Sequence, residues 1–539
     1  MKKKKIGAVI FFLLLITTLV VSAEMTILKN VSLFRPDGSF QQESFIILKG
    51  CKINKIGLMK ELGEGIFDNE YDLQGSFVYP AFIDPLYMGF QEKAAEEEER
   101  EKDTKNIESL ESKDREKREP FEERKLFIKR NVLDVVQIKK SGARKLVAGG
   151  FTMIHVVPDQ GVINGTSGII SLVSEELTEA VVVPEKFMFL PFKTNSRSYP
   201  TTHASLMAEL MQLREDSLYH QKMKKLQFFH ESQREKYMPE LDILLPFFTG
   251  EKRFLMMTRN IVEQRMVEIL RKKLKINPVI VASPDVWRRK VAAGADIILP
   301  LKFKPPLSSR YSQLGDKIKK EAGEKIYPEK IAEFFKTHDH VCLTAPDSGD
   351  YKTLVENIRI LMKNGVSEAA IIKSLTQNPA KLLDISGFAG SIKPGLLANL
   401  VVCDKKIFEE KAKITKVFVE GKLFDFKTRE GDGKPPVTNL TGKWKVKIES
   451  PMGSFDVKMT LEQEGNDLTG TISSPDGSLT DIQEGYISGD EVFIALTIDV
   501  GGQDIPLEIS AKVKGEKLEG TISIGSFGEG NFAATPENL

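Results

Sequence analysis

The stretch VYPAFIDPLYMGF, residues 78–90, decides how this chain folds and what its site can hold. Phe82 and Ile83 end a short apolar strand, Asp84 follows, and Leu86 and Met88 then occupy alternate positions. Alternate side chains of an extended segment point to the same side. In a barrel of parallel strands, the residues just past the carboxyl end of a strand line the mouth where sites lie. We therefore expect two apolar side chains at that mouth.

Strands and amphipathic helices alternate from Tyr79 to about Leu383. The clearest part of this series consists of a helix, a strand, a helix and a strand: RNIVEQRMVEILRKKLKI (259–276), PVIVAS (278–283), DVWRRKVAAG (285–294) and ADIILPL (295–301). Such alternation predicts a parallel sheet, and over a segment of this length a closed barrel is the expected form.

The last part of the chain is predicted to be all β. Trp444, Val446 and Ile448 alternate with lysines, as in strands that cover a core on one side. EGNDLTGTIS (464–473) and KGEKLEGTIS (514–523) resemble each other and predict two related hairpins. We expect a separate domain over residues 437–539, a small barrel or sandwich, after a Gly- and Pro-rich linker at 429–436.

Size and charge set broad limits. The chain has 539 residues, more than one hydrophobic core usually serves, so two or three domains are expected. Its 77 lysines and arginines nearly balance its 76 aspartates and glutamates. No overall field favours nucleic acid or an anionic membrane, and we expect no nucleic-acid partner.

The N-terminus has the pattern of an export signal. Lysines at positions 2–5 precede an apolar run over residues 6–21, and Val21-Ser22-Ala23 ends in the small residues that signal peptidase prefers. We interpret residues 1–23 as a signal peptide and expect a periplasmic or extracellular protein. The alternative is an uncleaved signal, through which the protein would contact a membrane, although the run is at the short end for a spanning helix.

Residues 91–130 are rich in charge, from the acidic run at 96–99 to SKDREKREPFEERK at 112–125. We expect a solvated helical or unstructured insertion directly after the first barrel strand. The alternative is a lid over the pocket.

Several stretches, taken in order, resemble the amidohydrolase superfamily and specifically its imidazolonepropionase-like secreted members. Pro80–Asp84 is similar to the first strand of that family. Asn399 stands where the family usually has an aspartate. The further matching stretches are AGGFT (148–152), PDQGVINGTSGI (158–169), GVS (365–367), LTQNPA (375–380), GSIKPG (390–395) and ANLVV (398–402).

The resemblance implies an α/β fold class. It implies a (β/α)8 TIM-like barrel over residues 79–383, and a composite β-sandwich in which residues 24–78 pair with residues 384–428. The C-terminal domain lies outside the resemblance and looks like a lipocalin-type barrel or a small sandwich.

The resemblance also implies where a metal would be held. Members hold a divalent metal at the mouth with histidines and a carboxylate, which lowers the pKa of a bound water. Here the histidine positions fall on Leu86, Met88, Met257 and Ala282, which we interpret as degenerate ligand positions. The last carboxylate falls near Asp347, or at Asp350. We therefore expect no metal or other cofactor, and zinc or another divalent ion only if the chain is an active hydrolase.

Asp84, His155 and Asp347 are weak catalytic candidates. Asp84 could act as an acid or base, or be satisfied by neighbouring backbone amides. His155 lies in the strand FTMIHVV and could point at the mouth, or be a satisfied core or surface histidine.

The sequence predicts a secreted amidohydrolase-family protein that has lost its metal site and acts by binding. The partner would be a small ligand, a second copy, or a catalytically intact relative. The activity that the family implies is hydrolysis of non-peptide or cyclic C–N bonds, and the alternative is an active hydrolase with a non-standard site. A third hypothesis, transport by the C-terminal domain, rests on fold analogy.

Overall fold

The computed structural model describes residues 24–90, 124–303, 327–426 and 434–537, with short gaps. The gaps within these ranges are 139, 160, 195–198, 227–237, 285, 289–294, 347–348, 451–452, 474–478, 483, 501–502 and 526–527. The proposed signal peptide and most of the charged insertion lie outside the described residues. None of the described helices combines the length and the apolar character that crossing a membrane requires.

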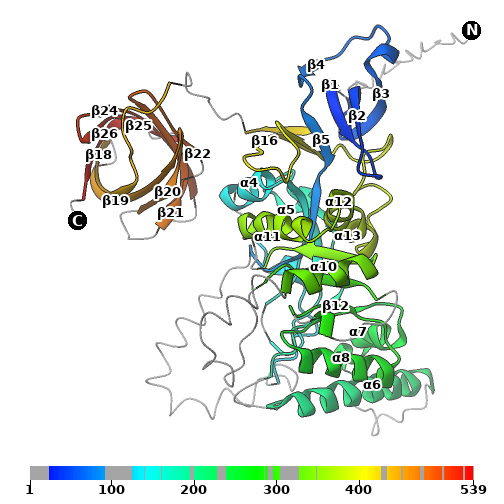
Figure 1. Cartoon of the computed structure of the whole chain (residues 1–539). Helices are drawn as coiled ribbons and strands as arrows, with labels where there is room; N and C mark the ends of the chain where they lie inside the picture. The colour runs from blue at the N-terminus through cyan, green and yellow to red at the C-terminus, as the bar shows by residue number, and fades with distance from the viewer. Residues whose placement is uncertain are drawn as a thin grey trace, which may run out of the picture.

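The two flanks of the barrel share one sheet of eight strands (Figure 1). Its order is β17-β16-β15-β5-β1-β2-β3, with β4 also paired to β1. Residues 24–78 and 384–428 were expected to form a composite β-sandwich, and in the described residues their strands are hydrogen-bonded into this one sheet. Its strands are β1 (Met25–Phe34), β2 (Phe40–Lys49), β3 (Lys52–Leu58), β4 (Asn69–Asp72), β5 (Phe77–Pro80), β15 (Leu400–Cys403), β16 (Ile414–Val419) and β17 (Lys422–Asp425).

The join between the two flanks is antiparallel and buried. β15 pairs with β5, with Val401 opposite Tyr79, and all four residues of β15 are fully buried. Apolar side chains of both flanks, including Leu28, Val78 and Phe418, form one core cluster. Sequence segments some 320 residues apart are therefore held together by main-chain hydrogen bonds and by a common core.

The middle of the chain forms a TIM-barrel-like domain of mixed α and β structure, as predicted. One sheet has the parallel order β10-β11-β12-β13-β14, and the other has the order β6-β7-β8-β9. The strands are β6 (Phe82–Tyr87), β7 (Phe151–Val156), β8 (Gly168–Ser171), β9 (Val181–Val183), β10 (Met188–Leu190), β11 (Phe254–Met257), β12 (Val279–Val281), β13 (Ile297–Pro300) and β14 (Val341–Thr344).

Contacts at both edges join the two sheets into a ring. Thr166 bridges to Met188 on one side, and on the other Thr344 Oγ1 donates to Asp84 Oδ1 at 2.7 Å. β8 departs from a uniform parallel barrel because it runs antiparallel to β7. The connection over residues 157–167 is too short for the helical crossover that a parallel strand needs.

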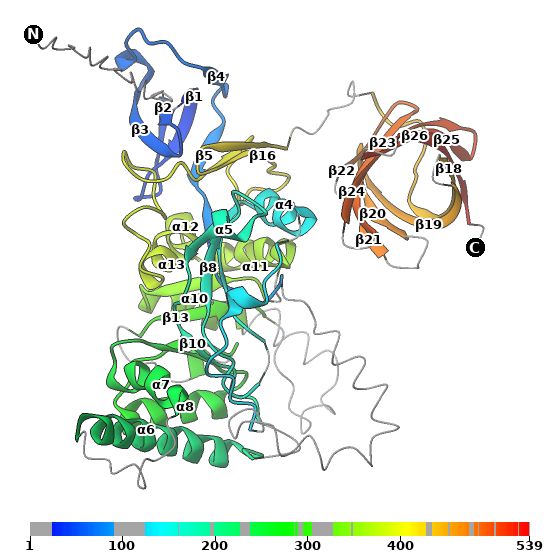
Figure 2. The same ribbon diagram turned by 180° about the vertical axis from the view of Figure 1, so that it is seen from behind.

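Helices surround the strands (Figures 1 and 2). The predicted helix at 259–276 is confirmed as α8, which starts where Asn260 Oδ1 accepts from the amides of Val262 and Glu263. The helices are α4 (Lys140–Ala148), α5 (Leu177–Ala180), α6 (His203–Leu226), α7 (Pro239–Thr249), α8 (Ile261–Leu274), α10 (Tyr327–Thr337), α11 (Tyr351–Lys363), α12 (Glu368–Leu375) and α13 (Gln377–Leu382).

Alternation along the barrel strands separates two apolar layers. Leu255 joins a cluster inside the barrel, while Phe254 and Met256 pack with α6, α7 and α8. We call the inside set the inner cluster. Its strand and strand-end members are Ile83, Leu86, Met153, Val157, Ile169, Phe187, Phe189, Leu255, Val279, Val281, Ile298 and Cys342, with Met88 and Met257 partly buried against them.

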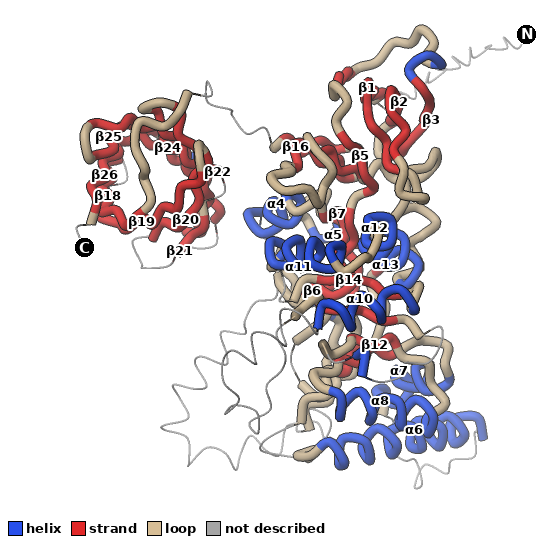
Figure 3. The backbone as a smooth tube through the Cα atoms, in the orientation of Figure 1, coloured by secondary structure: helices blue, strands red, loops and turns tan. Residues whose placement is uncertain are grey.

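The C-terminal domain is a closed antiparallel barrel (Figure 3). β18 pairs with β19 and β19 with β20, β20 pairs with both β21 and β22, and the series from β22 to β26 closes where β26 pairs with β18. The all-β prediction is confirmed. The strands are β18 (Gly442–Ser450), β19 (Gly453–Glu464), β20 (Asp467–Ser473), β21 (Leu479–Asp481), β22 (Glu484–Ser488), β23 (Glu491–Val500), β24 (Gln503–Lys514), β25 (Lys517–Ile524) and β26 (Glu529–Pro536).

The two similar segments of this domain form equivalent hairpins, as predicted. β19 and β20 turn at Gly465, and β24 and β25 turn at Gly515, each with φ of +64°. Positive φ at a two-residue turn is what glycine supplies at no steric penalty.

Candidate functional site

The barrel mouth carries apolar side chains at the first predicted ligand positions. Leu86 is 5% exposed and belongs to the inner cluster, and Met88 packs against that cluster. The register between β6 and β7 is irregular between Asp84 and Tyr87. Because of this irregularity, Ile83 and Leu86, an odd number of positions apart, both reach the inner cluster.

The next two strand ends differ from each other. Met257 ends β11 and packs against the inner cluster. Ala282 instead packs with the outer layer, in the cluster that includes Val286 and Tyr327. Since Val279 and Val281 face inside, Ser283 is the residue past β12 that alternation places on the inner side. Ser283 is fully buried, and its hydroxyl has no hydrogen-bond partner among the described residues.

Asp84 is fully buried and accepts three hydrogen bonds. Thr344 Oγ1 donates to Oδ1 at 2.7 Å, the Leu86 amide donates to Oδ1 at 3.0 Å, and the phenolic hydroxyl of Tyr351 donates to Oδ2 at 2.7 Å. Burial raises the pKa of Asp84 to about 6, although all three donors oppose that rise. Both carboxylate oxygens are thus engaged within the protein.

His155 is also fully buried, between two polar groups. Nδ1 lies 2.7 Å from the Pro85 carbonyl oxygen, which can only accept, so Nδ1 carries the proton. Nε2 then accepts from Ser167 Oγ at 2.7 Å. Burial lowers the pKa of His155 to about 4, which keeps the ring neutral at physiological pH. The Ser167 hydroxyl oxygen also accepts from the Phe187 amide at 3.0 Å.

The carboxylate expected after the last strand is not brought to these groups by any described contact. Asp347 lies outside the described residues. Asp350 serves as the N-cap of α11, where Oδ1 accepts from the Thr353 amide at 3.1 Å. This contact accounts for Asp350 as a helix cap.

The described mouth residues do not fit a catalytic zinc ion. Such an ion is commonly held by three protein ligands plus water. No group of three or more His, Cys, Asp or Glu side chains gathers at a metal-binding distance anywhere in the described ranges. Asp84 and His155 already bond within the protein, and Leu86, Met88 and Met257 present carbon and thioether groups.

Sequence reasoning missed the residues that hold Asp84 and His155. Thr344 and Tyr351 reach Asp84 from β14 and from the start of α11, and Ser167 reaches His155 from before β8. Of these three, only Thr344 could have been predicted from the sequence, because it alternates with Cys342 along the strand and therefore faces the inside of the barrel. Tyr351 reaches Asp84 because β14 lies next to β6 where the ring of strands closes. Ser167 reaches His155 because the chain turns back to form β8 antiparallel to β7.

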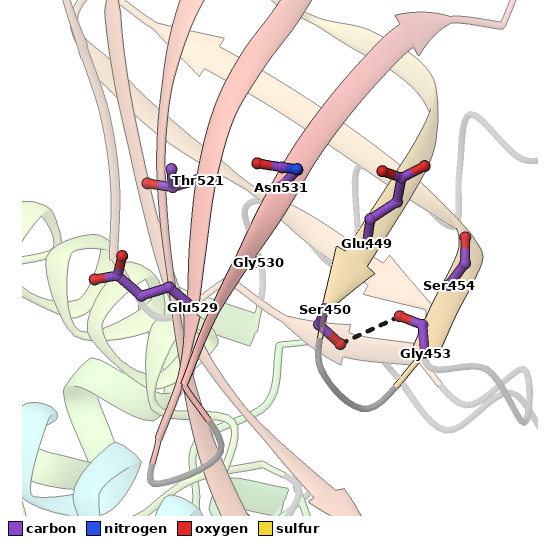
Figure 4. A pocket seen from close by; sticks show the side chains of 8 residues that line it. All are labelled: Glu449, Ser450, Gly453, Ser454, Thr521, Glu529, Gly530 and Asn531. Carbon is purple, nitrogen blue, oxygen red and sulfur yellow. Dashed lines mark hydrogen bonds between the residues drawn. The ribbon is translucent and has the colours of Figure 1, made fainter.

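A separate hollow of about 550 Å³ lies on the outside of the C-terminal barrel (Figure 4). Glu449 and Asn531 face it because their neighbours Ile448 and Phe532 are buried. Glu449 Oε1 pairs with Lys447 at 2.7 Å, which lowers the pKa of that carboxyl. The full lining is Glu449, Ser450, Gly453, Ser454, Thr521, Glu529, Gly530 and Asn531.

Comparison with known protein families matches one segment of the chain. Residues 329–424, which run from α10 through β17, match the model of the amidohydrolase family. This part of the chain is therefore similar to the amidohydrolase family. The match contains the GVS, LTQNPA, GSIKPG and ANLVV stretches, so the predicted resemblance to the amidohydrolase family is confirmed over this segment. No curated protein matches the chain.

One solved structure resembles this chain in fold. An amidohydrolase from Thermotoga maritima MSB8 has a TM-score of 0.59 at 19% identity, over 74% of this chain and 100% of that one. A Xaa-Pro dipeptidase with bound methionine has a TM-score of 0.39 at 15% identity, over 75% and 100% of the two chains. A molinate hydrolase has a TM-score of 0.43 at 12% identity, over 76% and 96%.

Proposed function

We propose that this amidohydrolase-family protein acts by binding rather than by metal-dependent hydrolysis. The observation that carries the proposal is the composition of the barrel mouth, where Leu86, Met88 and Met257 pack in or against one apolar cluster. A metal that acidifies water needs nitrogen and oxygen donors at such positions. Apolar and thioether side chains there disfavour that chemistry.

The same residues favour an apolar contact at the mouth. Met88 and Met257 are the partly buried members of the trio, so part of each side chain is accessible. Methionine is flexible and polarisable and adapts to irregular apolar partners. We propose that these two side chains contact a small apolar ligand or an apolar side chain of a partner, which would be a second copy or a catalytically intact relative.

The third part of the proposal is that the protein is exported. The basic and apolar N-terminus supports a signal peptide, and the resemblance of the sequence motifs to secreted imidazolonepropionase-like proteins favours the same location. We propose a periplasmic or extracellular protein of that subgroup, with the C-terminal barrel as an additional binding surface.

Metal analysis tests the proposal most directly. Mature protein is loaded with Zn²⁺ or Mn²⁺, freed of loose metal by gel filtration and measured by plasma mass spectrometry. We expect no stoichiometric metal. A Leu86→His/Met88→His variant, which restores two imidazoles, is a useful comparison in the same assay. One tightly held transition metal per wild-type chain would overturn the proposal.

The alternative, an active C–N hydrolase with a non-standard site, has one favourable observation. The raised pKa of Asp84, about 6, suits a general acid or base near neutral pH. This hypothesis predicts hydrolysis of a cyclic amide or dipeptide substrate that Asp84→Asn abolishes. Turnover that persists in Asp84→Asn at the wild-type rate would exclude Asp84 from the reaction.

A further inference from the structure

A second cavity lies at the amino-terminal end of the barrel strands, opposite the mouth. Its volume is about 240 Å³. Arg253, Asp296 and His340 immediately precede β11, β13 and β14, so all three come from strand starts. The rest of the lining comes from α13 and the residues after it: Asn378, Lys381, Leu382 and Asp384.

The two acids of this cavity are paired. Asp296 Oδ2 lies 2.8 Å from Arg253 Nη1, and Asp384 Oδ2 lies 2.5 Å from Lys186 Nζ. Lys381 and His340, by contrast, have no hydrogen-bond or ion-pair partner among the described residues. The cavity lining therefore has one cationic side chain, Lys381, whose charge no described acid offsets.

The wall of the cavity is held in place by internal bonds. Arg253 Nε donates to the Asn277 carbonyl at 3.0 Å, which fixes the guanidinium together with its ion pair to Asp296. Asn378 Nδ2 donates to the carbonyls of Asp339 and Val341, at 2.9 and 2.8 Å, which anchors both sides of His340 to α13. A fixed wall lowers the entropy lost when a ligand binds.

Arg253 also has an unmet donor. Its Nη2 is buried and has no hydrogen-bond partner in the described part of the chain. Ammonium, imidazole and guanidinium groups around one small hollow suit oxygen acceptors that carry negative charge.

We propose that this cavity is a binding site for a small oxyanion, of the size of inorganic phosphate or a short dicarboxylate. Lys381 supplies the principal positive charge for the anion, and His340 supplies a ring nitrogen. Arg253, held by its bonds to Asn277 and Asp296, forms a fixed part of the cavity wall. The site uses none of the mouth residues, so it holds whether the mouth binds an apolar partner or a metal.

Calorimetric titration of the full mature chain at low ionic strength tests this. Inorganic phosphate and succinate are the two probes, and chloride at equal ionic strength is the reference. We expect saturable binding of at least one probe, and the arm that binds identifies the phosphate or carboxylate source. Lys381→Gln should weaken binding about tenfold, the loss expected for one charge-assisted hydrogen bond. His340→Asn should weaken it less.

Lys373→Gln is the matched control, because Lys373 is an exposed lysine on the neighbouring helix α12. Its affinity should equal that of the wild type. Both lysines are exposed, so neither substitution threatens the fold, and equal thermal midpoints in chloride verify this. Absence of saturable binding by both probes, or an unchanged affinity in Lys381→Gln, would overturn the proposal.

Discussion

Asp84 and His155 are buried ionisable groups whose pKa values shift in opposite directions. The folded chain holds the Asp84 proton up to a pKa of about 6, above the usual 3.8, because burial disfavours the carboxylate. It releases the His155 proton down to a pKa of about 4, below the usual 6.5, because burial disfavours the imidazolium. Each group therefore makes the free energy of unfolding depend on pH.

The two dependences have opposite signs. For Asp84 the folded state binds more protons, so the free energy of unfolding falls as pH rises from about 4 to 6. For His155 the unfolded state binds more protons, so the free energy of unfolding falls as pH drops from about 6.5 to 4. In the wild type these contributions largely cancel between about pH 4 and 6.

Substitutions should separate the two contributions. Between pH 7 and 4.5, Asp84→Asn should lose about 2 kcal/mol more unfolding free energy than the wild type does, because the opposing Asp84 contribution is removed and that of His155 remains. His155→Gln should shift the profile in the opposite direction. Urea unfolding can follow Trp287 in a Trp444→Phe background, since the chain has two tryptophans. If the unfolding free energies of both variants and the wild type changed in parallel with pH, the pKa shifts assigned to Asp84 and His155 would be wrong.

The hydroxyl of Thr344 should stabilise the folded chain chiefly while Asp84 is ionised. Thr344→Val removes the 2.7 Å hydrogen bond to Oδ1 and leaves a buried carboxylate with one donor fewer. We expect a loss of about 1 to 3 kcal/mol in unfolding free energy at pH 7.5, and a smaller loss at pH 5. The same substitution in an Asp84→Asn background serves as the control. A loss of the same size at both pH values would show that packing, not the charge, is responsible.

At the scale of elements, backbone approach limits the C-terminal hairpins. A Cβ at Gly470 would meet the Thr460 carbonyl oxygen at 1.9 Å, and one at Gly520 would meet the Ser510 carbonyl oxygen at 2.0 Å. These glycines occupy the same position in the two similar hairpins. The similarity of the two segments therefore includes a glycine that both hairpins need, because a side chain at that position would collide with the paired strand.

Gly520→Ala should destabilise the C-terminal barrel. The added methyl group would push β24 and β25 apart, and overpacking of this kind typically lowers the free energy of unfolding by about 1 to 3 kcal/mol. Trp444 fluorescence in a Trp287→Phe background reports this domain. Gly387→Ala, which meets nothing within 4 Å, is the control and should leave the transition unchanged. An unaltered midpoint in Gly520→Ala would contradict the close approach.

At the scale of the whole molecule, the two flanks depend on each other. β15 lies between β5 and β16, so a chain without residues 400–425 would lose the inner partner of β5. The C-terminal barrel has no comparable role in that sheet. Lys145 and Asp481 form an ion pair at 3.2 Å, but both side chains are more than 60% exposed, and such pairs contribute little.

Two truncations test this dependence. A chain that ends at residue 426 should remain soluble and keep the thermal transition reported by Trp287. A chain that ends at Asn399 should aggregate, because the removal of β15 exposes the buried edge of β5 and its apolar core. Circular dichroism and gel filtration provide the measurements. Folding of the shorter chain, or collapse of the longer one, would contradict the proposed arrangement.

Much of the fold could be predicted from local pattern. The helix at 259–276, the strands around it and the alternating C-terminal strands follow from apolar periodicity, which depends on neighbours in the sequence. The direction of β8 and the register irregularity after Asp84 could not be predicted. They depend on the length of one connection and on how the ring closes.

The sequence by itself determined the resemblance to the amidohydrolase family, the barrel-like domain, the separate all-β region and the identities of Leu86, Met88 and Met257, because motifs and periodicity are local properties. Only the tertiary structure decided which partners occupy Asp84 and His155, that Ala282 faces the outer layer, and that Lys381 and His340 meet at one cavity. Those contacts join residues far apart in the chain, and only the closed ring of strands brings them within hydrogen-bond or packing distance.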